Sequence, residues 1–456
     1  MTSGTIFLVG LGPGSEDHMS ARARSAIAEA DCIIGYTTYI KLVADLVDGK
    51  EVIRKGMTEE LDRCFEALAR AREGKKVALI SSGDSGVYGM AGPTYEVLLD
   101  SGWRPGDGVD VEVIPGSSAI NSCAALVGAP LTHDACTISL SDLLTPWPVI
   151  ARRLEAAARA DFVVALYNPK SGRRTGQIVE AQRLLLLHRR ADTPVALVKS
   201  AYRRRQRIEL TTLEHMADCD IGMLTTVIVG NSNTFVREGL MVTPRGYANK
   251  YSKADSGKTT KDGEQSGRSL SMGLTGWKDQ LCHWLAEDNN RTLRAAQAHF
   301  DMPFAEVLSA IAAAPTEGGV CPPDWTACAI GRKEFAASLA FAEGWPSLRA
   351  VVRTEAGSVV ELLLSSSNFA IKGDWLNLIT DSAHLHIPWH KVTSVWVAGQ
   401  RGNIQGIYYC DASGHRLLTL QPTGAAIPFD PTTITEQLQV CTAPDQSLAE
   451  ESSHAS

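Results

Sequence analysis

The segment Gly10-Leu11-Gly12-Pro13-Gly14 follows the apolar run of residues 6–9 near the start of the chain. Glycine has no Cβ, so it permits positive φ angles and allows a ligand to come close to the backbone. The pattern is typical of a buried strand that ends in a ligand-binding loop. Amides and carbonyls of such a loop can hold a small molecule without a charged side chain.

This first loop departs from the dinucleotide-binding fingerprint G-x-G-x-x-G. Pro13 falls inside the turn, and no acidic residue closes a second strand about 20 residues later. Asp31 lies near that distance, but it precedes an apolar run and therefore opens a strand. The sequence thus disfavours NAD as the ligand.

Two further small-residue segments follow apolar runs in the same way. Residues 77–80 lead into Ser-Ser-Gly-Asp-Ser-Gly-Val-Tyr-Gly at 81–89, and residues 111–114 lead into Pro-Gly-Ser-Ser-Ala at 115–119. Helical stretches separate the three strands. We therefore predict an α/β fold with a parallel sheet and a ligand at the carboxyl edge of that sheet.

Composition and charge restrict the classes of partner. The 456 residues suffice for two or three domains, and 44% hydrophobic with 21% charged residues is ordinary for a globular protein. We find no apolar run near the roughly 20 residues of a membrane span and no signal sequence. The ten cysteines include no C-x-x-C pair, so we predict free thiols and no metal site. We expect a cytoplasmic protein without a membrane partner.

Acidic residues concentrate in the C-terminal part of the chain. From Thr275 onward, 11 Lys and Arg stand against 19 Asp and Glu, and the preceding part carries 33 against 32. Neither part has the basic excess that nucleic-acid binding requires. We expect no nucleic-acid partner.

Polar segments and periodicity predict the domain organisation. Residues 252–272 are polar and rich in Gly, Ser and Lys, which predicts a flexible linker, and residues 439–456 are predicted to be a disordered tail. Residues 1–251 should form two α/β lobes, about 1–120 and 121–251, with a break near 120–135. Residues 273–438 have helical spacing at 277–287, 292–299 and 305–313. From Leu348 they alternate, with turns at four glycines, which predicts an antiparallel sheet: Gly357, Gly373, Gly402 and Gly414.

Seven motifs, taken in order along residues 4–251, carry a resemblance to a known family. They are GLGPG, GDSGVYGMA, PGSSA, GAPLTHD, SLSDLLTPW, ALYNPKSGRR and TTVIVGNS. In this order they resemble the precorrin-3B C(17)-methyltransferase branch of the tetrapyrrole methylases. SLSDLLTPW and ALYNPKS are specific to that branch. The resemblance implies a two-lobed fold with S-adenosylmethionine in the cleft between the lobes, and a homodimer.

The resemblance also assigns the residues of the methyl-donor site. They come from the three glycine-rich loops of the first lobe and from three strand ends of the second. The residues are Pro13, Ser82, Gly83, Asp84, Val87, Ser118, Ala119, Tyr167, Asn168, Ala201 and Thr226.

The implied reaction is methylation of precorrin-3B at C-17 with contraction of the ring to precorrin-4, a step of cobalamin biosynthesis. Contraction needs proton transfers, so a general acid or base should face the tetrapyrrole. The candidates are His133 and Asp142, with Tyr88 in reserve. A loop histidine with an ordinary hydrogen bond is the alternative for His133.

The tetrapyrrole substrate would carry many carboxylates, which arginine can bind through two parallel hydrogen bonds. Positive charge follows ALYNP and recurs in the run 203–207. We assign substrate contacts to Gly12, Lys170, Arg173, Arg174 and Arg205. A solvated loop is the alternative for both runs.

Residues 274–430 resemble one repeat of the HemS/ChuX haem-utilisation family. The matching segments are residues 291–308, 372–378, 384–387 and 392–397. This resemblance implies an α+β domain that binds haem or another tetrapyrrole. Alternation places His384 and His386 on one face as possible haem contacts. The chain departs from the haem-degrading members, which carry Gln-Ile-His where it has Val-Glu-Leu at 360–362. A metal-free docking role and a purely structural role stay open.

Two other functions also stay open for the whole chain. The cobalt-dependent counterpart, which acts on cobalt-factor III, shares every motif quoted above. A haem-trafficking protein with an inactive methylase half is the second alternative, and the intact glycine loops argue against it.

Overall fold

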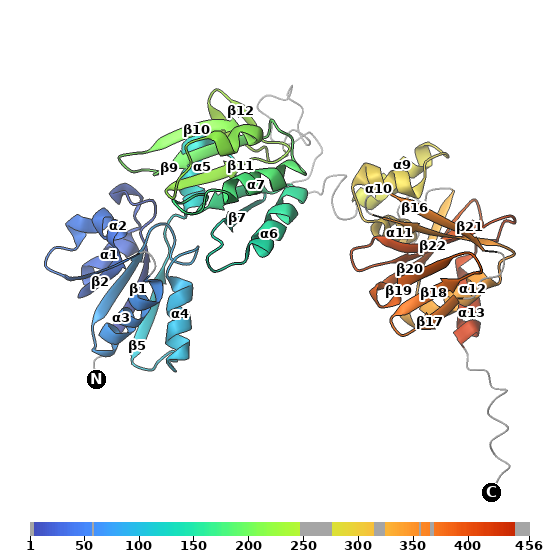
Figure 1. Cartoon of the computed structure of the whole chain (residues 1–456), viewed down its shortest axis with the longest axis horizontal. Helices are drawn as coiled ribbons and strands as arrows, with labels where there is room; N and C mark the ends of the chain where they lie inside the picture. The colour runs from blue at the N-terminus through green and yellow to red at the C-terminus, as the bar shows by residue number, and fades with distance from the viewer. Residues whose placement is uncertain are drawn as a thin grey trace, which may run out of the picture. The chain divides into compact units, whose positions relative to one another are not determined.

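The structure is a computed structural model that describes residues 4–56, 59–246, 276–313, 324–354, 357–364 and 369–442. The chain divides into two compact units, Met1–Lys253 and Ala254–Ser456 (Figure 1). The linker expected at 252–272 lies outside the described residues. Most of the tail expected at 439–456 does so too, but helix α13 (Pro431–Thr442) reaches into its first residues.

The first lobe of the N-terminal unit is built on a five-stranded parallel sheet in the order β3-β2-β4-β1-β5 (Figure 1). Its strands are β1 (Gly4–Gly10), β2 (Cys32–Tyr36), β3 (Glu51–Lys55), β4 (Lys76–Ser81) and β5 (Val109–Ile114). The three predicted strands are confirmed as β1, β4 and β5, which are neighbours. Because they run parallel, their carboxyl ends and the three glycine-rich loops meet at one edge.

Helices cover both faces of this sheet, since successive apolar residues of its strands point to opposite sides. Helix α1 (Ala21–Glu29) packs Ile27 in one core with Val9. Helices α3 (Glu60–Arg72) and α4 (Ala91–Asp100) pack on the other face, in a core that includes Leu79. The sheet is parallel, as predicted, and helices cover both of its faces.

The second lobe is a mixed sheet in the order β10-β9-β11-β8-β7. Its strands are β7 (Ala135–Ser139), β8 (Val163–Tyr167), β9 (Pro194–Lys199), β10 (Arg207–Thr212) and β11 (Thr225–Val229). Only the β7–β8 pair is parallel; the other three pairs are antiparallel. Helices α6 (Trp147–Arg159) and α7 (Gln177–Leu186) cover one face.

Helix α5 (Ala119–Val127) covers the other face of the second sheet. It buries Cys123 and Val127 in a core with Ile228, a residue of β11. The second lobe therefore begins at α5, beside the boundary near residue 120 that the sequence indicates. The apolar sequence of α5 would suit a core of either lobe, so periodicity alone could not assign it.

The C-terminal unit has the predicted order of helices followed by an antiparallel sheet. Three helices lead, α9 (Gly276–Glu287), α10 (Leu293–Phe300) and α11 (Phe304–Ala313). A six-stranded sheet in the order β14-β20-β21-β22-β15-β16 and a three-stranded sheet β17-β18-β19 follow. The bounds are β14 (Trp325–Ile330), β15 (Leu348–Arg353), β16 (Val359–Leu364), β17 (Phe369–Lys372), β18 (Trp375–Ile379), β19 (His384–Pro388), β20 (Ser394–Gln400), β21 (Asn403–Cys410) and β22 (Arg416–Pro422).

Two cores lie on opposite sides of the six-stranded sheet. The leading helices pack on one face with Tyr408, while helix α12 (Phe335–Glu343), α13 and the small sheet pack on the other with Tyr409. All four predicted turn glycines have φ between 57° and 91°. Glycine is favoured there because other residues rarely adopt positive φ.

No helix in the segments listed above is both long and apolar enough to cross a membrane.

Candidate methyl-donor site

The first two of the three loops at the carboxyl edge of the first sheet are joined by backbone hydrogen bonds. Leu11 N donates to Ser81 O at 2.9 Å, which carries the first loop against the second. Gly12 and Gly83 then exchange two bonds, Gly12 N to Gly83 O at 3.0 Å and Gly83 N to Gly12 O at 2.7 Å. The loops therefore continue the pairing of strands β1 and β4 beyond the end of the sheet.

Glycine is required where these loops touch. A Cβ on Gly116 would lie 2.2 Å from Gly83 O and 2.6 Å from Gly10 O, and a Cβ on Gly10 would lie 2.7 Å from Gly116 N. Asp84 joins the second loop to the third, because its carboxylate accepts from Gly86 N at 2.7 Å and from Gly116 N at 3.0 Å. Backbone thus packs directly on backbone.

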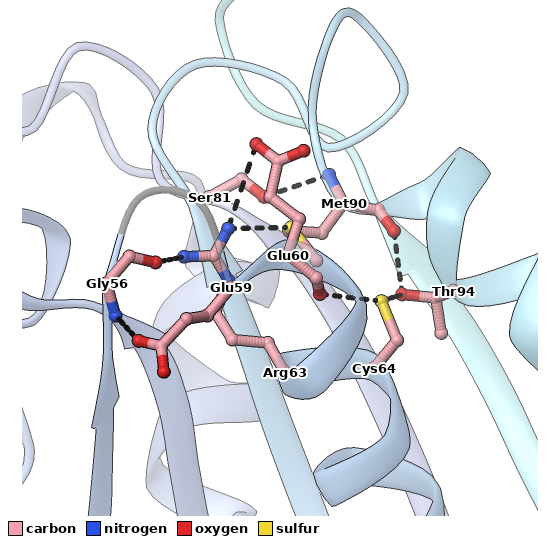
Figure 2. A network of polar contacts seen from close by, with 8 residues as sticks. All are labelled: Gly56, Glu59, Glu60, Arg63, Cys64, Ser81, Met90 and Thr94. Atoms are coloured by element: carbon pink, nitrogen blue, oxygen red, sulfur yellow. Dashed lines mark hydrogen bonds and ion pairs between the residues drawn. The ribbon is translucent and has the colours of Figure 1, made fainter. Parts of the chain in front are cut away.

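Figure 2 shows how Met90, at the end of the second loop, is held by Ser81 and by Arg63 of α3. Met90 N donates to Ser81 Oγ at 3.3 Å, and the Arg63 guanidinium donates to Gly56 O at 2.9 Å and to the Met90 thioether at 3.5 Å. Arg63 is 4% exposed, and its Nε has no hydrogen-bond partner among the described residues. Glu60, at 3.8 Å, offsets its charge. This buried cation ties α3 to the residue that precedes α4.

The second lobe adds side chains and strained turns to the same edge. Tyr167 accepts from Ile120 N and shares a hydrogen bond with Ser118 Oγ, both at 2.7 Å, and burial raises the pKa of its phenol. Asn168, Ser200 and Tyr202 have φ of 50–56°. Non-glycine residues in this conformation cost about 1–3 kcal/mol each and gather at functional sites.

Tyr88 connects the second glycine-rich loop to the second lobe. Its φ is 53°, and its hydroxyl donates to Thr137 O and accepts from Ser139 N, both at 3.2 Å. Both partners lie on β7, the edge strand of the second sheet. Tyr88 therefore spans the cleft between the lobes.

Together these elements enclose a cleft of about 920 Å³, open solvent included. All eleven residues predicted for the donor site line it, and so do Gly12 and Tyr88. The eleven are Pro13, Ser82, Gly83, Asp84, Val87, Ser118, Ala119, Tyr167, Asn168, Ala201 and Thr226. Other lining residues carry no glycine-rich signal and could not be found from the motifs: Tyr39, Cys123, Met223 and Leu224.

Known proteins can now be compared with this geometry. The family model of Tetrapyrrole (Corrin/Porphyrin) Methylases matches residues 5–217. A protein of Priestia megaterium named cobalt-factor III methyltransferase is 62% identical over 248 residues, which are 54% of this chain and 46% of that protein. The chain thus spans about half the length of this relative. A precorrin-3B C(17)-methyltransferase of Sinorhizobium sp. is 41% identical over 251 residues, which are 54% of this chain and 98% of that protein.

The chain belongs to the tetrapyrrole methylase family. A solved structure supports the fold: the crystal structure of the methyltransferase CobJ is 35% identical, with a TM-score of 0.50, and the match covers 53% of this chain and 100% of that one. The expected two-lobed methylase fold is confirmed for the N-terminal unit. The resemblance of the C-terminal unit to the HemS/ChuX family stays a prediction.

Several residues predicted for catalysis or substrate binding do not line the cleft of this tetrapyrrole methylase. His133 is exposed, and its Nδ1 accepts from Asp134 N at 2.9 Å. Asp142 accepts from Gln177 Nε2 at 2.8 Å. Arg174 donates to Leu140 O at 3.0 Å and to Asn168 O at 3.3 Å, so it supports the cleft from outside. Three further candidates do not line it either: Lys170, Arg173 and Arg205.

The run 203–207 separates into residues with different surroundings. Arg203 lines the cleft, whereas Arg204, Arg205 and Arg207 are exposed. The sequence located the positive charge but pointed to Arg205 as the contact. Which arginine reaches the cleft depends on the turn between Ser200 and Gln206, and the order of residues does not reveal that turn.

We predict that Gly116→Ala destabilises the N-terminal unit by about 1–3 kcal/mol, the usual cost of an atom forced into packed surroundings. Urea unfolding followed by circular dichroism measures this free energy. Gly92→Ala is the matched control, because its Cβ would meet nothing within 4 Å. Equal free energies of unfolding for the two variants would contradict the proposed packing of the loops.

Proposed function

We propose that the N-terminal unit transfers a methyl group from S-adenosylmethionine to C-17 of a tetrapyrrole of cobalamin biosynthesis and contracts the ring. The observation that carries the proposal is the coincidence of site and family. Every residue assigned to the donor by motif lines one cleft, in a chain 62% identical to a protein named cobalt-factor III methyltransferase. An inactive methylase half would have no reason to retain this lining.

The cleft suits S-adenosylmethionine in its chemistry. The backbones of the three loops pack directly on one another, and Gly12 and Gly83 of the first two loops line the cleft. When bound, the donor supplies an electrophilic methyl group, so this chain has chiefly to hold it in line with the carbon nucleophile. Fixed loops perform that positioning without a charged catalyst.

For the proton transfers of ring contraction, we favour Tyr88 among the three candidates. It lines the cleft, and its phenol lies where both lobes meet. His133 and Asp142 stay candidates for the wider tetrapyrrole site, as do Lys170, Arg173, Arg174 and Arg205 for substrate carboxylates. Those residues lie on the second lobe, whereas Gly12 lies on the first.

The proposal also covers whether the substrate contains cobalt, as cobalt-factor III does, or is metal-free, as precorrin-3B is. The higher identity, 62% against 41%, belongs to the relative named for cobalt-factor III, so we place this substrate before precorrin-3B. A homodimer and a cytoplasmic location, which the resemblance and the composition suggest, stay predictions.

The direct test supplies purified chain with S-adenosylmethionine and either cobalt-factor III or precorrin-3B. We expect a product heavier by one methyl group, with the absorption spectrum of a contracted ring, and faster turnover of the cobalt form. Faster turnover of precorrin-3B would reverse the order of substrates. Absence of methyl transfer to both would refute the proposed function.

A substitution separates the acid–base role of Tyr88 from its place in the lining. Tyr88→Phe should lower kcat about 10²–10⁴-fold, the usual contribution of a general acid or base, and change the affinity for S-adenosylmethionine much less. Tyr95→Phe, on α4, is the matched control. A larger kcat loss in His133→Ala or Asp142→Asn than in Tyr88→Phe would move the role to that residue.

For the C-terminal unit we propose binding of haem or a related tetrapyrrole. The supporting observation is a pair of exposed histidines on β19, His384 and His386, with ring centroids 6.4 Å apart. His386 Nδ1 is hydrogen-bonded to Asn377 Oδ1 at 2.6 Å, which fixes the ring and leaves Nε2 for a ligand. A second tetrapyrrole site on the same chain would raise the local concentration of ligand to around the mM range.

Titration of the full chain with haem tests this proposal. We expect a saturable shift of the Soret band at micromolar haem that the double variant His384→Ala/His386→Ala loses and His415→Ala keeps. An unchanged titration of the double variant would exclude these histidines. Lack of saturable binding by the wild type would exclude the haem role.

A further inference from the structure

Arg203 crosses the cleft and holds the two lobes together. It comes from the turn after β9 in the second lobe, and its guanidinium reaches two residues of the first lobe. Nε donates to Pro13 O at 2.6 Å, and Nη2 donates to Ser82 Oγ at 2.7 Å. Both partners belong to the glycine-rich loops. The remaining nitrogen, Nη1, has no hydrogen-bond partner among the described residues.

The surrounding backbone is built to present this side chain. Ser200 and Tyr202, on either side of Ala201, have φ of 52° and 56°, and Arg203 N donates to Ser200 O at 3.0 Å. On the opposite wall, Gly14 lies beside it, and a Cβ there would lie 2.7 Å from Leu42 Cδ1 and 3.3 Å from Arg203 Nε. A glycine of the first loop and a strained turn of the second lobe therefore both serve the position of one guanidinium.

The charge of Arg203 is not matched by an acid. Among the described residues that line the cleft, it is the one basic side chain, and Asp84 is the one acidic side chain. Asp84 bonds instead to the amides of Gly86 and Gly116, and no carboxylate of the described residues lies within 4.0 Å of Arg203. Burial lowers the pKa of the guanidinium, although arginine keeps its proton in proteins.

We propose that Arg203 binds a carboxylate of a ligand in the cleft and thereby completes the contact between the lobes. The inference rests on the proposed function, which supplies two sources of that group, the methionine carboxylate of the donor and an acetate or propionate of the tetrapyrrole. A guanidinium with two nitrogens committed to the first lobe offers the third to such an anion. The bond would join both lobes and the ligand through one residue.

Calorimetric titration of the full chain with S-adenosylmethionine and with its decarboxylated form tests the inference. The two donors differ only in the carboxylate. Arg203→Met removes the guanidinium, Arg203→Lys keeps the charge, and Arg190→Met is the control for loss of one positive charge, because Arg190 is exposed and paired with Asp192 beyond the opposite end of β9. The KM for the tetrapyrrole completes the set of measurements.

Two results would support the inference and name the source of the carboxylate. If it is the donor's, Arg203→Met weakens S-adenosylmethionine about 10- to 100-fold, a usual loss for a charge-assisted hydrogen bond, and leaves the decarboxylated form nearly unchanged. If it is the tetrapyrrole's, both donors bind as before and KM rises by a similar factor. In either case Arg203→Lys should recover part of the loss.

Other results would overturn it. Equal weakening of both donors would reduce Arg203 to a structural contact between the lobes, and unchanged binding of every ligand would leave it without a role. If the wild type binds neither donor nor tetrapyrrole, the proposed function fails and the inference fails with it. If the wild type binds its ligands, and Arg203→Met neither distinguishes the two donors nor raises the KM for the tetrapyrrole, the inference fails alone.

Discussion

The N-terminal unit depends on the direct contact of backbone with backbone where β1, β4 and β5 end. Gly10, Gly83 and Gly116 meet there without side chains between them, and the exchange of hydrogen bonds between Gly12 and Gly83 fixes their spacing. Because such contacts hardly deform, the floor of the cleft has its shape before a ligand arrives. The positioning that methyl transfer needs is therefore a property of the sheet edge itself.

The second lobe meets this floor through side chains. Tyr88 reaches β7, Arg203 reaches the first and second loops, and Tyr167 holds Ser118 and the start of α5. Backbone strain accompanies these contacts at Tyr88, Ser200 and Tyr202. Strained backbone of this kind gathers at binding sites, and here it presents a few polar groups to a cleft that Gly12 and Gly83 line from the first lobe.

Much of this could be predicted from the sequence where the requirement is local. A position that comes close to a neighbouring backbone, or that has positive φ as at Gly402, requires glycine. Such a position can therefore be recognised in the sequence as a glycine at the end of a strand. Features that depend on tertiary packing could not be predicted in this way. The apolar helix α5 suits either lobe, and the run 203–207 does not indicate that only Arg203 turns inward. His133 and Asp142 lie in motifs of the family, but neither residue lines the cleft, since a motif fixes sequence position and not direction.

The central claim is that loops of both lobes form a single donor site. Hydrogen–deuterium exchange of the full chain, with and without S-adenosylmethionine, tests it most directly. The account predicts simultaneous protection of residues 10–14, 82–88, 117–120 and 200–203, with no change in the hairpin of β12 (Phe235–Arg237) and β13 (Leu240–Val242). Protection confined to one lobe, or saturable binding of the donor without protection of the glycine-rich loops, would contradict it.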